Sequence, residues 1–181
     1  KYDAIIAAMS ITEPRKKKVT FSSSYADTPN IFVVRKDNPL ANFQSELEHL
    51  TLDDISPVEQ KALDALLNAF KGKVIGVQVA TIFQKFADAY LGEHSEIRIY
   101  DFQHTVDLEL YQGRLDALVG GMAYWVPVLK SEQGEEYKII GPQMTGGPFG
   151  SGIGVAVRHK DQELADMFSK AIEAALRDGT I

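Results

Sequence analysis

The feature that most constrains the fold is an alternation of strand-like and helix-like segments between residues 73 and 119. β-rich runs predict strands at 74–77, 96–100 and 115–119, with helices between them at 82–90 and 105–111. Strands that alternate with helices along a chain form parallel, doubly wound sheets. We therefore expect an α/β protein in which this stretch forms a parallel sheet.

Further elements are predicted on both sides of this block. Residues 40–55 are weakly patterned and acidic, and we expect a surface loop there. Ser56 and Glu59 form a capping box around Pro57, which predicts the start of a helix. A final helix is expected to be capped by Asp161 and to stop at Gly179. Strands are also predicted at 2–9, where the residues are apolar enough to be buried, and at 19–21, 31–34 and 153–157.

Composition excludes several classes of protein. The chain has 19 basic and 25 acidic residues, a net charge of −6, which argues against a nucleic-acid-binding surface. Its one basic run, residues 15–18, is expected to be a solvated turn. No apolar run approaches the ~20 residues of a membrane span. Cysteine is absent from the sequence, which excludes disulfides and thiol chemistry. Because the sequence starts at Lys1 without a methionine or a leader, we expect a processed or partial chain.

Two turn-rich segments bracket the strand–helix block. Residues 26–30 and 145–152 contain several glycines and prolines. A chain that leaves one lobe, builds a second and returns needs two such crossings. Composition alone leaves open whether these segments are hinges or simple loops.

The chain carries no recognisable catalytic constellation. Its four histidines are scattered without metal-ligand spacing, and no nucleophile elbow or phosphate-binding loop is present. The glycines at 150, 152 and 154 precede a strand, so they are not a dinucleotide fingerprint. We expect no catalytic residue, no metal and no cofactor. The histidines are His49, His94, His104 and His159.

Two turns at strand ends hold the most informative polar groups. Ser10 and Arg15 follow the first strand, and a guanidinium offers a fork of donors that matches a carboxylate. Gln78, Ala80 and Thr81 follow the strand at 74–77, where main-chain N–H groups and a hydroxyl can seat an anion. The alternatives are a solvated arginine in the first turn and an ordinary threonine helix cap in the second.

These segments together resemble the bacterial extracellular solute-binding proteins of family 3, the periplasmic receptors of polar amino-acid ABC importers. Within that family, Ala7 to Ser10, Gly76 to Gln78 and the long stretch between Pro39 and Gly72 are similar to the octopine- and nopaline-binding branch. The residues that carry the family resemblance are Tyr2 to Arg15, Val19 to Ser22, Tyr25, Gly72 to Val77, Gly113 to Ala117, Gly141-Pro142 and Gly179 to Ile181.

The resemblance implies a fold like the type II periplasmic binding proteins, with two lobes of doubly wound mixed sheets and a two-strand hinge. The family carries roughly eighty residues before Tyr2 and closing helices after Ile181, so lobe 1 is expected to be incomplete and the chain truncated at both ends. The implied boundaries are 1–25 and 150–181 for partial lobe 1, 26–30 and 145–152 for the hinge, and 28–147 for lobe 2 with an inserted loop and helix at about 40–71.

The resemblance also implies a ligand site shared by both turns. Ser10 and Arg15 match the positions that grip the ligand α-carboxylate, and Ala80 and Thr81 match the donors of lobe 2. The family's ammonium-binding Asp is replaced here by Gly120-Gly121, which suits an opine with a substituted amine or simply opens room. The complete implied ligand-binding set is Met9, Ser10, Arg15, Gln78, Ala80, Thr81 and Gly121.

The expected function is binding of a small carboxylated amino acid or opine between two lobes, and its delivery to an ABC permease in the inner membrane. The expected location is the periplasm. One alternative is a truncated, non-binding remnant that self-associates into a homo-oligomer through the incomplete lobe 1. A second is an enzyme like cyclohexadienyl dehydratase, although Glu135 and Glu136 lie in a polar loop and supply no acid over the turns.

Overall fold

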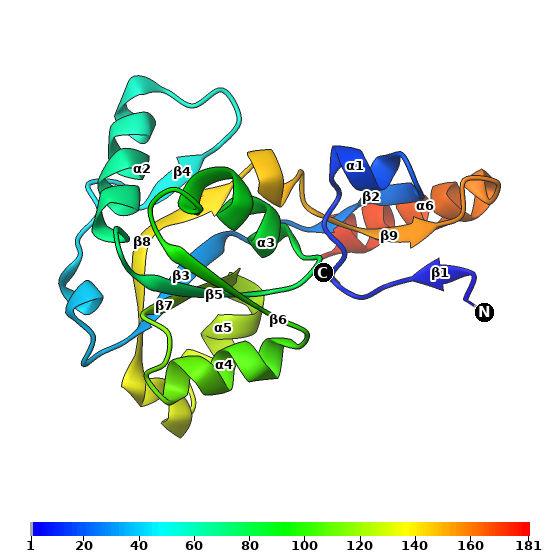
Figure 1. The fold of residues 1–181 in the computed structure, drawn as a ribbon. Coiled ribbons are helices and arrows are strands. Elements are labelled where there is room, and N and C mark those ends of the chain that lie inside the picture. Colours follow the sequence, from blue (N-terminus) through cyan, green and yellow to red (C-terminus); the bar gives the residue numbers. More distant parts are fainter. Residues whose placement is uncertain (1) are drawn as a thin grey trace. The chain divides into compact units, whose positions relative to one another are not determined.

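Two crossings of the chain, near Thr28 and Pro148, separate the structure into two units. The structure is a computed structural model and describes residues 2–181 (Figure 1). Unit 1 consists of Lys1–Thr28, of which residues 2–28 are described, and Phe149–Ile181; unit 2 is the uninterrupted segment Pro29–Pro148. The assignment of the crossings as a hinge stays a prediction.

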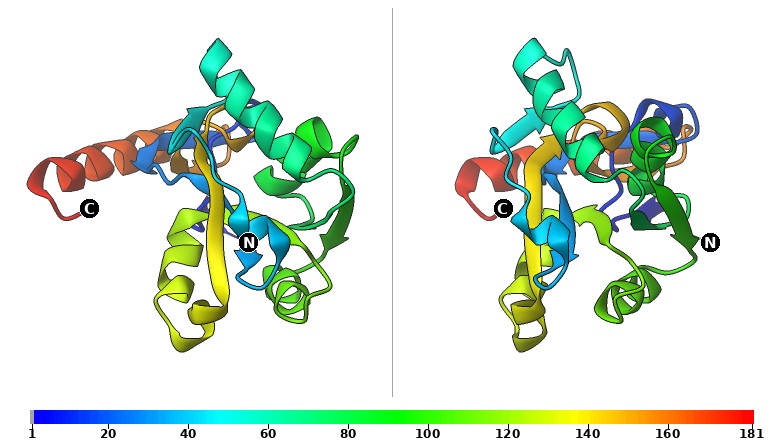
Figure 2. Two further views of the ribbon diagram at one scale, coloured as in Figure 1. Left: turned by 90° about the vertical axis from the view of Figure 1, so that its left-hand side faces the viewer. Right: turned by 60° about the vertical axis from the view of Figure 1, so that its left-hand side comes forward.

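Unit 2 is built on a mixed sheet of six strands in the order β4-β8-β3-β7-β5-β6. Its parallel part pairs β5 with β6 and β7, as the alternating segments predict. The strand β3 pairs antiparallel with β7 and β8, and Figure 2 shows the long β8 in yellow beside it. The strands are β3 (Asn30–Arg35), β4 (His49–Thr51), β5 (Val74–Gln78), β6 (Glu96–Tyr100), β7 (Ala117–Gly121) and β8 (Tyr137–Thr145).

Helices cover both faces of this sheet. Successive buried side chains of β3 point to opposite faces, and each face packs against different helices. Phe32 packs against Phe70 at the end of α2 and against Phe86 of α3, with ring centroids 4.5 and 5.9 Å apart. Its neighbours Ile31 and Val33 belong to a core cluster on the other face, with residues of α4 and α5. The helices are η1 (Pro39–Asn42), α2 (Pro57–Ala69), α3 (Ile82–Phe86), η2 (Ala87–Leu91), α4 (Gln103–Tyr111), α5 (Met122–Leu129), η3 (Glu132–Glu136) and η4 (Gly147–Phe149).

Unit 1 has a three-stranded antiparallel sheet in the order β1-β9-β2. The long helix α6 (Gln162–Asp178) packs against β2 and β9. The remaining elements are β1 (Ala4–Ile5), α1 (Glu13–Lys16), β2 (Thr20–Ala26) and β9 (Ile153–Val157).

Local signals set the helix ends, with one exception. The hydroxyl of Ser56 accepts the Glu59 N–H and the Glu59 carboxylate accepts the Ser56 N–H, so the predicted capping box is confirmed. Gly179 ends α6 with a φ of 78°, as predicted. Asp161 stands at the start of α6 but makes no side-chain cap, because its carboxylate accepts a hydrogen bond from Arg158 instead.

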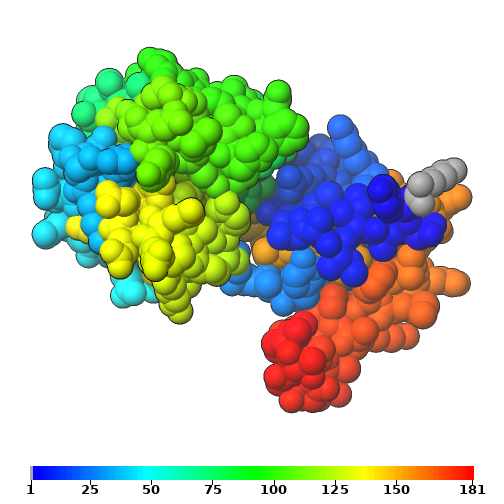
Figure 3. All heavy atoms as spheres, turned by 90° about the horizontal axis from the view of Figure 1, so that it is seen from below, coloured from blue at the N-terminus to red at the C-terminus, as the bar shows by residue number. Residues whose placement is uncertain are grey.

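The prediction of a buried strand at 2–9 is wrong. The strand covers only Ala4–Ile5, and Tyr2 and Ile6 are 86% and 63% exposed. The reason is that β1 is an edge strand, paired in the described chain with β9 alone. In Figure 3 this dark blue segment lies on the surface of unit 1.

Three further expectations differ from the structure. The stretch 40–55 is not simply a surface loop, because Leu40 is buried in η1 and β4 pairs with β8. The strand expected at 115–119 lies two residues later, at Ala117–Gly121. The polar residues after 21 continue β2, because the Ser22 hydroxyl accepts the Val155 N–H of the neighbouring strand.

None of the helices in residues 2–181 has the length and apolar character of a membrane span.

Candidate functional site

The turn of unit 1 brings Ser10 and Arg15 together. The chain leaves β1, forms an isolated bridge between Ser10 and Ile153, and then makes one turn of helix in α1. That turn carries Arg15 back toward Ser10, and its guanidinium donates a hydrogen bond of 3.0 Å to the Ser10 carbonyl oxygen. The Ser10 side chain is buried and Arg15 is half-buried.

The charge of Arg15 is uncompensated within the described chain. None of the ion pairs found among residues 2–181 includes Arg15, although neighbouring Lys16 pairs with Glu13. Burial lowers the pKa of Arg15 below its ordinary value, but an arginine side chain stays protonated in proteins. A guanidinium has five N–H donors, and one is used on Ser10. The turn therefore offers a fixed cation with free donors, which suits a carboxylate.

Hydrogen bonds of its main-chain groups hold this turn in one conformation. The Ala8 N–H donates to the Tyr25 hydroxyl, and the Met9 carbonyl accepts the Gly154 N–H at 3.1 Å. Ala8 has a φ of 49°, a left-handed conformation that side-chain-bearing residues rarely adopt. Such strain persists where the surroundings over-determine it, and it concentrates at functional sites.

The turn of unit 2 connects β5 to α3 and contains a second strained residue. Ala80 has a φ of 59°, and its N–H donates to the Gln84 side-chain oxygen at 2.8 Å. The Thr81 hydroxyl accepts the Gln84 N–H and donates to the Gln78 carbonyl oxygen at 2.7 Å. The alternative of a threonine helix cap is therefore what the structure shows for Thr81, and anion binding there stays a prediction.

The Ala80 N–H is one group in this turn that a ligand oxygen can compete for. The Gln84 amide oxygen is its acceptor in this structure, and a carboxylate oxygen can accept the same hydrogen bond. Gln78 is oriented away from this group, because its side chain donates to the Asp101 carbonyl oxygen at 3.2 Å. The Gln78 side chain is thus tied to the neighbouring β6 end.

The two glycines at the end of β7 have different surroundings. A Cβ atom on Gly120 would lie 2.6 Å from Nε1 of Trp125, so Gly120 is needed for the packing of that buried ring. A Cβ atom on Gly121 would have Phe83 at 3.8 Å as its nearest neighbour, which is ordinary contact. Of the two glycines, Gly121 is the one with room beside its Cα atom. The space expected beside Gly120 is filled by the ring of Trp125.

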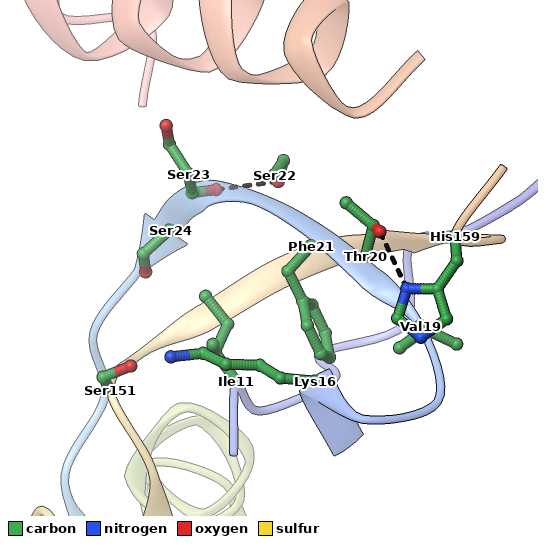
Figure 4. A pocket seen from close by; sticks show the side chains of 10 residues that line it. All are labelled: Ile11, Lys16, Val19, Thr20, Phe21, Ser22, Ser23, Ser24, Ser151 and His159. Atoms are coloured by element: carbon green, nitrogen blue, oxygen red, sulfur yellow. Dashed lines mark hydrogen bonds between the residues drawn. The ribbon is translucent and has the colours of Figure 1, made fainter. Parts of the chain in front are cut away.

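The structure brings the predicted residues together as two groups. Within unit 1 these are Met9, Ser10 and Arg15; within unit 2 they are Ala80 and Thr81, with Gln78 bonded to the Thr81 hydroxyl. Unit 1 also contains an open groove of about 550 Å³ that lies beside α1 and includes neither Ser10 nor Arg15. Figure 4 shows its lining, in which the Lys16 side chain extends beside Ile11. In the part of the chain that the structure describes, no group of three acidic or histidine side chains is placed to hold a metal.

Sequence reasoning missed Ala8, Tyr25 and Gln84 as parts of these turns. No residue pattern marks Ala8 as strained, and Tyr25 acts from 17 residues away. Gln84 carries a usable signal, since a glutamine at the third helical position after a threonine is a capping-box pattern.

Comparison with known proteins decides the family. The pattern of the bacterial extracellular solute-binding proteins, family 3, matches residues 1–181. The chain belongs to this family. An L-arginine-binding protein of Pseudomonas aeruginosa is 33% identical over 182 residues, which cover 99% of this chain and 61% of that protein. An octopine-binding periplasmic protein of Rhizobium meliloti is 29% identical over 168 residues, which cover 93% of this chain and 57% of that protein.

The structural comparison agrees with this family 3 assignment. A solved structure of an ancestral arginine-binding protein bound to glutamine has a TM-score of 0.74 and 29% identity; the match covers 98% of this chain and 67% of that one. The family and the type II-like α/β fold predicted from the sequence are thereby confirmed. The chain spans about three fifths of the length of the curated relatives it matches.

Proposed function

We propose that the protein to which this chain belongs binds a small amino acid or opine through its carboxylate and presents it to an ABC permease in the periplasm. The observation that carries this proposal is the half-buried Arg15 guanidinium, which lies against Ser10 without a carboxylate partner among the described residues. A carboxylate that accepts two of its remaining donors would supply the missing charge.

The second turn supports the same ligand chemistry. A carboxylate or carbonyl oxygen can replace the Gln84 amide oxygen at the Ala80 N–H. The proposed site is centred on Ser10 and Arg15 in unit 1 and on Ala80 in unit 2. The family resemblance adds Met9, Gln78, Thr81 and Gly121 to it. Relatives named for arginine and for octopine supply the first ligands to test. Binding without turnover is proposed, since the family pattern that matches residues 1–181 is that of solute-binding proteins.

Isothermal calorimetry with L-arginine and octopine tests the proposal. We expect saturable binding that Arg15→Ala weakens at least about tenfold, because a hydrogen bond to a charged group contributes about 1.5–3 kcal/mol. Arg177→Ala is the matched control. Arg177 is exposed near the end of α6, and its substitution removes the same positive charge. Equal binding by the Arg15 and Arg177 variants contradicts the proposed carboxylate site.

A second candidate function, self-association through unit 1, is favoured by one observation. The edge strand β1 and the residues that flank it expose Tyr2, Ile5 and Ile6, and an apolar strand edge is a template for pairing with another chain. We propose that two copies pair there when nothing else covers this edge. Sedimentation across a range of concentrations tests this, and a constant mass of one 20.0 kDa chain contradicts it.

A further inference from the structure

Where the chain leaves unit 2 at the second crossing, it lies beside β4 and the residues that follow it. These residues belong to the stretch 40–71, which the family resemblance implies to be an insertion. The strand β4 pairs in parallel with the end of β8, so that Thr51 lies opposite Thr145. Beyond this pair, the Leu52 N–H donates to the Thr145 carbonyl oxygen at 2.8 Å. One step further, the Gly147 N–H donates to the Asp53 carboxylate at 2.8 Å. The contact therefore continues past the end of the strand into the crossing itself.

The crossing is also fitted sterically to this segment. Gly146 and Gly147 have φ values of 72° and 51°, and a Cβ atom on Gly146 would lie 2.4 Å from a carboxylate oxygen of Asp53. A Cβ atom on Gly147 would lie 2.9 Å from Cβ of Leu52. Glycine is needed at both positions, because any side chain would push the crossing away from Asp53.

The segment that carries Asp53 is itself anchored to the start of α2. The Glu59 carboxylate accepts the Thr51 N–H at 3.0 Å as well as the Ser56 N–H and hydroxyl. Asp54 has a φ of 48°, so the segment is held in a turn that an unconstrained aspartate seldom adopts. The segment that carries Asp53 is therefore fixed to the start of α2.

The first crossing is tied to unit 2 by different groups. The Pro29 carbonyl oxygen accepts the Met122 N–H at 2.9 Å, and the buried Asn30 amide donates to the Met144 carbonyl oxygen at 3.1 Å. In unit 1, the Ser24 hydroxyl donates to the Ala26 carbonyl oxygen and accepts the Ile153 N–H. At the first crossing, these ties leave residues 27–28 between them.

We propose that Asp53 is a positioning residue that fixes the second crossing at Gly147 and limits bending between the units at this point. The proposal deepens the proposed function, since ligand-driven closure needs two units that bend at defined points. In this proposal, the inserted stretch 40–71 holds the second crossing in place through Asp53. Asp53 acts through the Gly147 main chain and contacts no ligand.

Distances between spin labels test this on the chain without ligand. The sequence has no cysteine, so Lys85→Cys in α3 and Lys170→Cys in α6 place one label in each unit at exposed positions. We expect Asp53→Ala to broaden the distribution of label distances. Asp53→Asn should restore the narrow distribution, because its amide oxygen still accepts the Gly147 N–H. Asp64→Ala, which removes the same charge from the exposed face of α2, is the matched control.

Amide exchange gives the second readout. Loss of one hydrogen bond is expected to speed exchange of the Gly147 amide about two- to tenfold in Asp53→Ala, with no change in Asp64→Ala. A label distribution and a Gly147 exchange rate that are the same in both alanine variants overturn the proposal. Because ligand is absent from both measurements, a failure of ligand binding in the unmodified chain leaves their result intact.

Discussion

The substitution Gly120→Ala should destabilise unit 2, because the added methyl group meets a ring that has no space to move. Its Cβ atom would lie 2.6 Å from Nε1 and 2.7 Å from Cδ1 of Trp125, closer than real Cβ contacts allow. Trp125 is 1% exposed and its ring packs edge-on against Tyr124 and Tyr137. Overpacking of this kind costs about 1–3 kcal/mol, and the lower entropy of the unfolded alanine chain offsets about 0.4–1 kcal/mol of it.

The matched control is the adjacent Gly121→Ala. Gly121 has φ −77° and ψ 137°, which any residue adopts, and its nearest neighbour is at 3.8 Å. This variant should be as stable as the parent or up to about 1 kcal/mol more stable. Trp125 is the only tryptophan in the sequence, so its fluorescence during urea unfolding reports unit 2 directly. Equal free energies of unfolding for the Gly120 and Gly121 variants would refute the steric reasoning.

Two further predictions concern pH and the second turn. Hydrogen bonds from the Ser56 hydroxyl and from the Thr51 and Ser56 N–H groups lower the pKa of Glu59 from 4.5 to about 2. The resulting stability is present above pH 4.5 and is lost as the pH falls toward 2, so urea unfolding across this range should show a smaller loss in Glu59→Gln than in the parent chain. Gln84→Ala removes the acceptor that competes for the Ala80 N–H, so calorimetry should show about two- to tenfold tighter ligand binding; weaker binding would mean that Gln84 contacts the ligand itself.

Features that depend on neighbouring residues could be predicted from the sequence. The Ser56 capping box and the left-handed Gly179 are set within a few residues, and both occur where the pattern places them. The parallel pairing of β5 with β6 and β7 follows from the alternation of strands and helices. In these cases the local preference and the final packing agree.

Features that depend on distant partners could not be predicted. The helix α5 starts at Gly121 without a side-chain cap and contains Pro127, so its local signals oppose a helix. The strand β8 contains Gly141 with a φ of 73° and Pro142, which read locally as breaks. Pairing with β3 overrides these signals, and that partner is more than a hundred residues away.

The candidate site shows the same division. The residue types Ser10, Arg15 and Thr81 point to anion binding without knowledge of the fold. The hydrogen bonds of Ala8 and Ala80 depend on Tyr25 and Gln84, and they are visible only once the turns are built. The prediction that Gly120 opens space failed for the same reason, because Trp125 returns onto it from the next helix.

The division of unit 1 into two pieces of sequence favours an order of folding in which unit 2 forms first. The Ser24 hydroxyl meets Ile153 across 129 residues, and closing so long a loop in an unfolded chain carries a large entropic penalty. Unit 2 is continuous, and once it is folded Asn30 and Met144 are neighbours at the bases of both crossings. Most of the loop is then closed before β2 and β9 meet. During synthesis, unit 1 can assemble only after β9 and α6 have left the ribosome, when unit 2 has already had time to fold.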